Sequence, residues 1–95
     1  MKPMRATKAE QPEIYTIVKR EMPAIHRAVG KMAKQLRGLS DVSQKRAIAE
    51  LTAAWIVAIY PDDLGLAISL SDAMREQTDI ILKEAWEHRE RQQRH

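Results

Sequence analysis

The sequence contains no cysteine and no phenylalanine, and only three of its 95 residues are glycine. Without cysteine the chain can form no disulfide bond, and it has neither a thiolate ligand for a metal ion nor a cysteine nucleophile. The residue types that dominate the middle of the chain are Ala, Leu, Ile, Met, Glu, Gln, Lys and Arg, which all favour helix. These features predict an all-α protein.

Long hydrophobic runs are also missing. A membrane-spanning helix needs roughly 20 apolar residues, and the most apolar segment, AAWIVAIY at residues 53–60, is shorter and lies between Glu50 and Asp62. The N-terminal sequence MKPMRATKAEQPE is charged and lacks the apolar centre of a secretory signal. We therefore expect no membrane association and a cytoplasmic location.

The net charge of +3 conceals an uneven distribution. Residues 1–46 contain 11 Lys and Arg against 4 Asp and Glu, whereas residues 47–95 contain 5 against 9, so the two halves carry +7 and −4. Such a division has two interpretations. Either a basic face is offered to an anionic partner, or the two halves pair with each other, within one chain or across a dimer.

The length predicts one domain, since domains commonly run from about 50 to 200 residues. We expect a flexible N-terminal arm at 1–10, a single helical domain at 11–87 and a polar, fraying C-terminal tail at 88–95. The predicted fold is a small four-helix bundle with a long C-terminal helix.

Proline and glycine mark the first helix boundaries. Pro12 suits the first position of a helix, and Pro23 is expected to end or kink that helix and to open the next one. Gly38 is placed to cap the segment 24–38 at its C-terminus. The alternative is that the first two helices form one kinked helix.

A third helix is expected from about Val42 to Tyr60, where Pro61 disfavours helical geometry. Its candidate N-terminal caps are Asp41, in a capping box with Gln44, or Ser40 or Ser43. The main apolar stripe of this helix consists of Ile48, Leu51, Trp55, Ala58 and Ile59. Because little polar surface remains after Leu51, the pattern is typical of a central helix that is buried almost all round.

The fourth helix is expected to begin after the adjacent acids Asp62 and Asp63. Either side chain can cap its N-terminus, where a negative charge also interacts favourably with the helix dipole. A break at 69–71 is left open, because two serines weaken that turn.

The basic face of the segment 24–38 is the strongest functional signal. No acid occurs between Glu21 and Asp41. The cations that could follow a phosphate backbone are Arg20, Arg27, Lys31, Lys34 and Arg37. The alternative is a solvated face that carries charge for solubility, and no recognisable nucleic-acid motif accompanies these residues.

No group of residues predicts catalysis, a cofactor or a metal site. Asp62 and Asp63 are better explained as helix caps than as paired carboxylates. Glu84 and His88 share a helix face, but two exposed ligands make a weak metal site. We therefore expect a protein that is not an enzyme.

The largest apolar side chains suggest protein contacts. Trp55, Leu82 and Trp86 are the candidate residues for a dimer or partner interface. The alternative is that Trp55 belongs to the core and that Trp86 covers a neighbouring residue. The leading hypothesis is a non-catalytic adaptor, inhibitor or regulator that forms a homodimer and docks a protein partner, and the second is a nucleic-acid-binding accessory protein.

Overall fold

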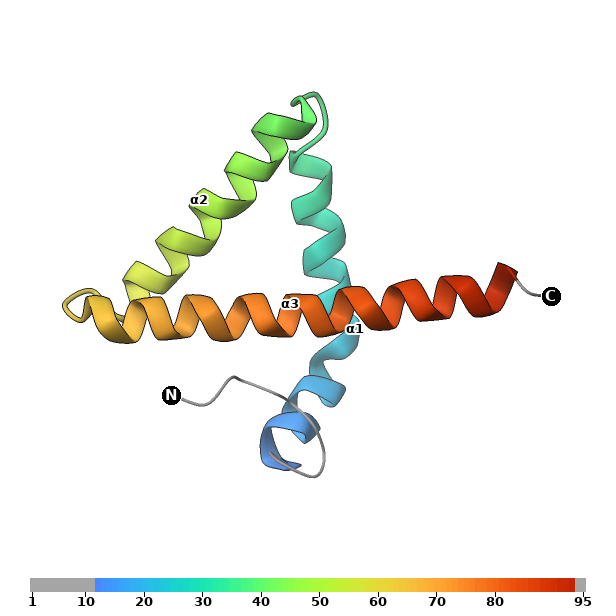
Figure 1. Ribbon diagram of the computed structural model, residues 1–95, viewed down its shortest axis with the longest axis horizontal. Helices are drawn as coiled ribbons and strands as arrows, with labels where there is room; N and C mark the ends of the chain where they lie inside the picture. The colour runs from blue at the N-terminus through green and yellow to red at the C-terminus, as the bar shows by residue number, and fades with distance from the viewer. Residues whose placement is uncertain (1–11, 94–95) are drawn as a thin grey trace. The chain divides into compact units, whose positions relative to one another are not determined.

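The computed structural model describes residues 12–93 and shows helices only within that part of the chain. Three helices follow one another: α1 (Pro12–Gln35), α2 (Asp41–Ile59) and α3 (Leu64–Gln93) (Figure 1). The all-α prediction and the long C-terminal helix are confirmed, but the number of helices is three rather than four. The predicted flexible arm at 1–10 lies outside the described residues, which fall into two compact units, 12–55 and 56–93.

The prediction that Pro23 separates two helices is wrong, because α1 continues through it without interruption. The alternative of one kinked helix is correct in that a single helix spans both segments. Proline removes one backbone hydrogen bond from a helix interior, here the bond to the carbonyl of Lys19. Lys19 and Pro23 are both exposed, so water can satisfy the freed carbonyl. The fixed φ of proline is itself compatible with the helix that follows it.

Gly38 ends the first helical segment as predicted. Its φ of +91° lies in the left-handed region that side chains with a Cβ rarely adopt. Short-range backbone bonds tighten the turn, with Leu36 N–H donating to Ala33 O at 3.1 Å and Leu39 N–H donating to Leu36 O at 3.2 Å. Gly38 therefore lets the chain reverse before α2 begins.

The cap of α2 is Ser40, one of the predicted alternatives, rather than the capping box of Asp41 and Gln44. Ser40 Oγ accepts a hydrogen bond from Ser43 N–H at 3.3 Å, as an N-cap hydroxyl does. The Gln44 side chain instead donates to Leu39 O at 3.0 Å. Asp41 occupies the first turn, where its carboxylate accepts from Val42 N–H at 3.2 Å.

The sequence YPDD at 60–63 stops one helix and starts the next. α2 ends at Ile59, and only Tyr60 separates this last residue from Pro61. Asp63 then caps α3, with its Oδ1 atom accepting from Leu66 N–H at 3.0 Å. The role predicted for this acid pair is thus confirmed for Asp63.

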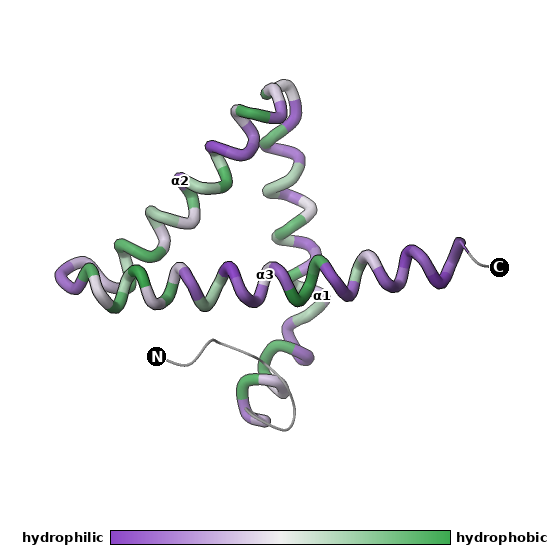
Figure 2. Tube along the Cα trace, in the orientation of Figure 1, coloured by the Kyte–Doolittle hydropathy of each residue, from purple (hydrophilic) through white to green (hydrophobic). Residues whose placement is uncertain are grey.

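Helix α3 spans 30 residues and passes through 69–71 without a break. Leu70 is 5% exposed, and packing at this turn outweighs the weak helix preference of the serines beside it. Residues 88–93 remain helical although they are polar throughout, and Figure 2 shows this end of α3 as hydrophilic.

The core of the unit 56–93 consists of small and medium-sized aliphatic side chains. Within residues 12–93, the buried side chains are Ile56, Leu70 and Ala73, at 6%, 5% and 4% exposure. Their burial places the contact between the last turn of α2 and the second and third turns of α3. The expectation that α2 is buried almost all round is wrong, because Ile56 is its one buried residue and Trp55 is 47% exposed.

Candidate protein-interaction surfaces

Helix α3 carries apolar side chains on two faces. Leu70 and Ala73 are buried on one face, while Leu82 and Trp86 lie on another. At the helical rotation of ~100° per residue, the mean directions of these two pairs differ by roughly 170°. The buried residues lie in the first half of α3, and in its second half Leu82 and Trp86 are exposed, as is Ile81 at 58%.

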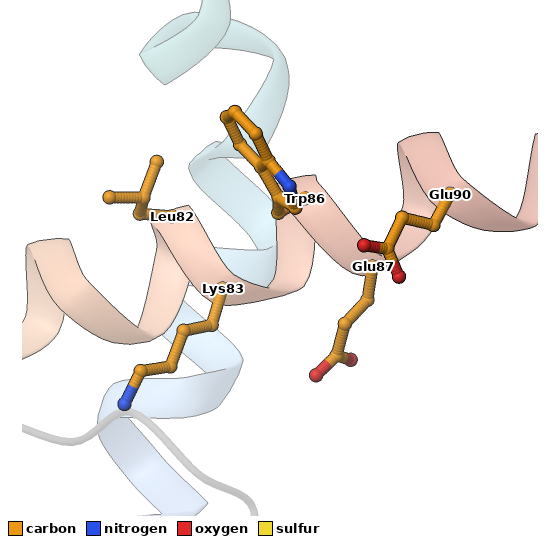
Figure 3. A pocket seen from close by; sticks show the side chains of 5 residues that line it. All are labelled: Leu82, Lys83, Trp86, Glu87 and Glu90. Atoms are coloured by element: carbon orange, nitrogen blue, oxygen red, sulfur yellow. The ribbon is translucent and has the colours of Figure 1, made fainter.

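The pair Leu82 and Trp86 forms what we call the α3 ridge. Figure 3 shows the two side chains rising from the same side of α3, one turn apart. Leu82 is 55% exposed and Trp86 is 58% exposed. The Arg89 guanidinium lies 5.9 Å from the centre of the Trp86 ring, within the range of a cation–π contact. The structure brings these two predicted interface residues together, one helical turn apart.

Carboxylates line one flank of the α3 ridge. Glu87 and Glu90 line a shallow open hollow together with Leu82, Lys83 and Trp86 (Figure 3). Asp79 lies on the same flank, one turn before Lys83. We call Asp79, Glu87 and Glu90 the acidic rim, and all three are exposed. Sequence reasoning missed the rim, although its spacing of about one and two helical turns was visible in the sequence.

A second exposed apolar surface lies on α2. Ile48, Leu51 and Trp55, which we call the α2 stripe, are 53%, 57% and 47% exposed. Their mean direction differs from that of Ile56 by roughly 110° at the helical rotation. From residue 51 to residue 59 the helix contains no charged side chain. The α2 stripe is thus an exposed aliphatic and aromatic surface that the contact made by Ile56 does not cover.

The predicted basic face is present on α1, with one exception. At the helical rotation, the cations that fall within an arc of about 60° are Arg20, Arg27, Lys31 and Lys34, which we call the basic stripe. All of them are exposed, and none forms an ion pair with another residue of the described range 12–93. Arg37 lies in the turn after α1, so the helix does not place it on the stripe.

Two of the residues considered for chemistry, Asp63 and His88, make contacts within their own helix. Asp63 is engaged as a helix cap. His88 Nε2 lies 3.1 Å from the side-chain nitrogen of Gln92. No group of three or more potential metal ligands occurs within residues 12–93, and no helix in this range is both long and apolar enough to cross a membrane.

Comparisons with protein families, curated proteins and solved structures find no significant match to this chain.

Proposed function

We propose that the chain is a small, non-catalytic interaction protein that associates with itself through the α2 stripe and docks a protein partner through the α3 ridge. In this role it acts as an adaptor, inhibitor or regulator, without a cofactor. The observation that carries the proposal is the position of Trp86, which is 58% exposed on the side of α3 opposite to its buried residues.

The pairing of Trp86 with a second exposed apolar side chain, Leu82, favours an interaction surface. Tryptophan and leucine side chains one turn apart are the anchors with which helices commonly dock on one another. Contiguous exposed apolar side chains on a small protein mark interaction surfaces. Leu82 and Trp86 meet this description, and the local packing of α3 does not need them.

The α2 stripe suits contact between two copies of the chain. In a symmetric dimer the same surface faces itself, so a charged surface would repel its own copy. Ile48, Leu51 and Trp55 repeat at helical spacing, and the helix around Trp55 carries no charge. Pairing of two such stripes would give a helical bundle built from two copies.

Self-association is tested by placing a charge in the α2 stripe. We expect Leu51→Glu to raise the dimer dissociation constant by at least about tenfold, because a carboxylate would be buried between apolar surfaces. Light scattering coupled to gel filtration, followed by sedimentation over a range of concentrations, measures the effect.

The matched control for Leu51→Glu is Ala53→Glu. Ala53 is exposed and lies on the polar side of α2, near the ion pair between Arg46 and Glu50 at 2.8 Å. The Ala53→Glu variant should leave the dimer dissociation constant unchanged. A wild-type chain that stays monomeric at all concentrations, or equal effects of the two variants, would contradict the role of the stripe.

The basic stripe supports a second candidate function, the binding of nucleic-acid phosphates. Four contacts with duplex DNA would make the logarithm of the affinity fall with the logarithm of salt concentration at a slope of about −3.6. We expect Lys31→Glu combined with Lys34→Glu to abolish such binding to generic duplex or single-stranded DNA and RNA. The control, Lys45→Glu combined with Lys83→Glu, changes the net charge equally away from the stripe. Absence of binding at low salt would discard this function.

A further inference from the structure

We infer that the partner docked at the α3 ridge presents a cationic amphipathic helix. The inference rests on the proposed function, since it specifies the chemistry of the partner at the same surface. Asp79, Glu87 and Glu90 flank the ridge on one side, where Lys83 lies among them and Arg91 follows Glu87 by one helical turn. The net charge of this flank is negative, whereas the whole chain carries +3.

The shape of the ridge favours a helix as its occupant. Leu82 and Trp86 project one turn apart from a straight run of helix (Figure 3). Side chains spaced in this way fit between the ridges of a second helix. A helix whose apolar side covers Trp86 would bring its own flank against Glu87 and Glu90, so cations on that flank would be attracted and anions repelled.

The same charges disfavour a second α3 as the occupant. Two α3 helices that paired antiparallel through their ridges would bring their Glu90 flanks onto the same side of the contact. Carboxylates would then face carboxylates, and like charges across a contact oppose association. The α3 ridge is therefore better matched to a different, positively charged helix than to its own copy.

Arg89 makes the two flanks of the ridge differ in charge. Its guanidinium lies over the Trp86 ring on the flank opposite to Glu87 and Glu90. A docked helix thus meets carboxylates on one side of the tryptophan and a guanidinium on the other. Cations along only one flank of the partner helix fit this arrangement, because cations on both flanks would place some of them against Arg89.

The test compares two designed helical peptides that share an apolar face and differ only in one flank, which carries lysine in one peptide and glutamate in the other. Binding of each fluorescein-labelled peptide to the full chain is measured by fluorescence anisotropy. We expect the cationic peptide to bind at least about tenfold more tightly at low salt, with the difference shrinking as salt rises. Because the chain is positive overall, non-specific attraction would favour the anionic peptide instead.

Variants of α3 locate the effect. Glu87→Lys combined with Glu90→Lys should remove or reverse the preference between the peptides. Glu84→Lys combined with Asp62→Lys is the matched control, since it changes the net charge equally at two exposed residues away from the ridge, and it should leave the preference intact. An equal effect of this control pair would overturn the inference.

The outcomes separate the inference from the proposed function. Equal binding of both peptides that is lost in Trp86→Ala would overturn the cationic partner and support docking at the ridge. Absence of binding by either peptide would overturn both. If the double Glu87 and Glu90 variant lost self-association, the occupant would be a second copy of the chain, which would also overturn the inference.

Discussion

Truncation of Trp86 to alanine is expected to weaken the docking of a helical partner by at least about 30-fold, which corresponds to ~2 kcal/mol of binding free energy. The indole is 58% exposed in the free chain and would be covered in the complex, so its removal takes away the largest apolar contact. The anisotropy of the labelled cationic peptide measures the change.

The helical content of Trp86→Ala should remain that of the parent chain. The ring makes one cation–π contact with Arg89, and such contacts contribute ~0.5–1 kcal/mol at exposed sites. Trp86→Phe keeps an aromatic anchor and should retain much of the affinity. Unchanged binding by Trp86→Ala would show that the ring is not a docking anchor, and a loss of circular dichroism at the helical minimum would show that the ring supports the fold.

Truncation of Leu70 to alanine should have the largest effect on stability, lowering the free energy of unfolding by ~2–4 kcal/mol. Leu70 is 5% exposed and is the largest side chain that α3 buries in the core of residues 56–93. Its loss would leave a cavity beside Ile56 and Ala73 in a core that has few other side chains to fill it. Thermal and urea unfolding, followed by circular dichroism, report the change.

Leu82→Ala is the matched control for Leu70→Ala. It removes the same atoms from the same helix, but at a side chain that is 55% exposed. Its cost should stay within ~0.5 kcal/mol, as for most surface substitutions. Comparable destabilisation by the two variants would contradict the division of α3 into a packed face and an exposed face.

Local signals in the sequence predicted the helix boundaries well. The positive φ of Gly38, the stop before Pro61 and the cap by Asp63 each depend on residues within one turn of the boundary. Such signals act through the backbone of adjacent residues and need no knowledge of what packs against a helix.

Pro23 shows where this local reasoning fails. A proline inside a helix costs one hydrogen bond, but the neighbouring turns can outweigh that cost when the freed carbonyl is exposed. Whether a proline ends a helix therefore depends on the helix propensity and solvent exposure of both sides, and the sequence rule captures neither.

Burial was the harder quantity to predict. The apolar period of α2 placed Ile48, Leu51 and Trp55 on one side of the helix, but the wide apolar surface also predicted burial almost all round, which is wrong. The structure buries Ile56, which lies on a different side. A hydrophobic period shows which residues share a face, and it does not show which face another helix covers. The acidic rim went unnoticed for a related reason, because its meaning depends on the exposed ridge beside it.

The central claim is that the two tryptophans serve two different contacts, Trp55 between copies of the chain and Trp86 with a partner helix. Acrylamide quenching of fluorescence in the single-tryptophan variants Trp55→Phe and Trp86→Phe tests it directly. We predict that Trp55 becomes shielded as the protein concentration rises, whereas Trp86 stays accessible until the cationic peptide is added. A Trp86 that is shielded at every concentration without peptide, or a Trp55 that is equally quenched at all concentrations, would contradict the account.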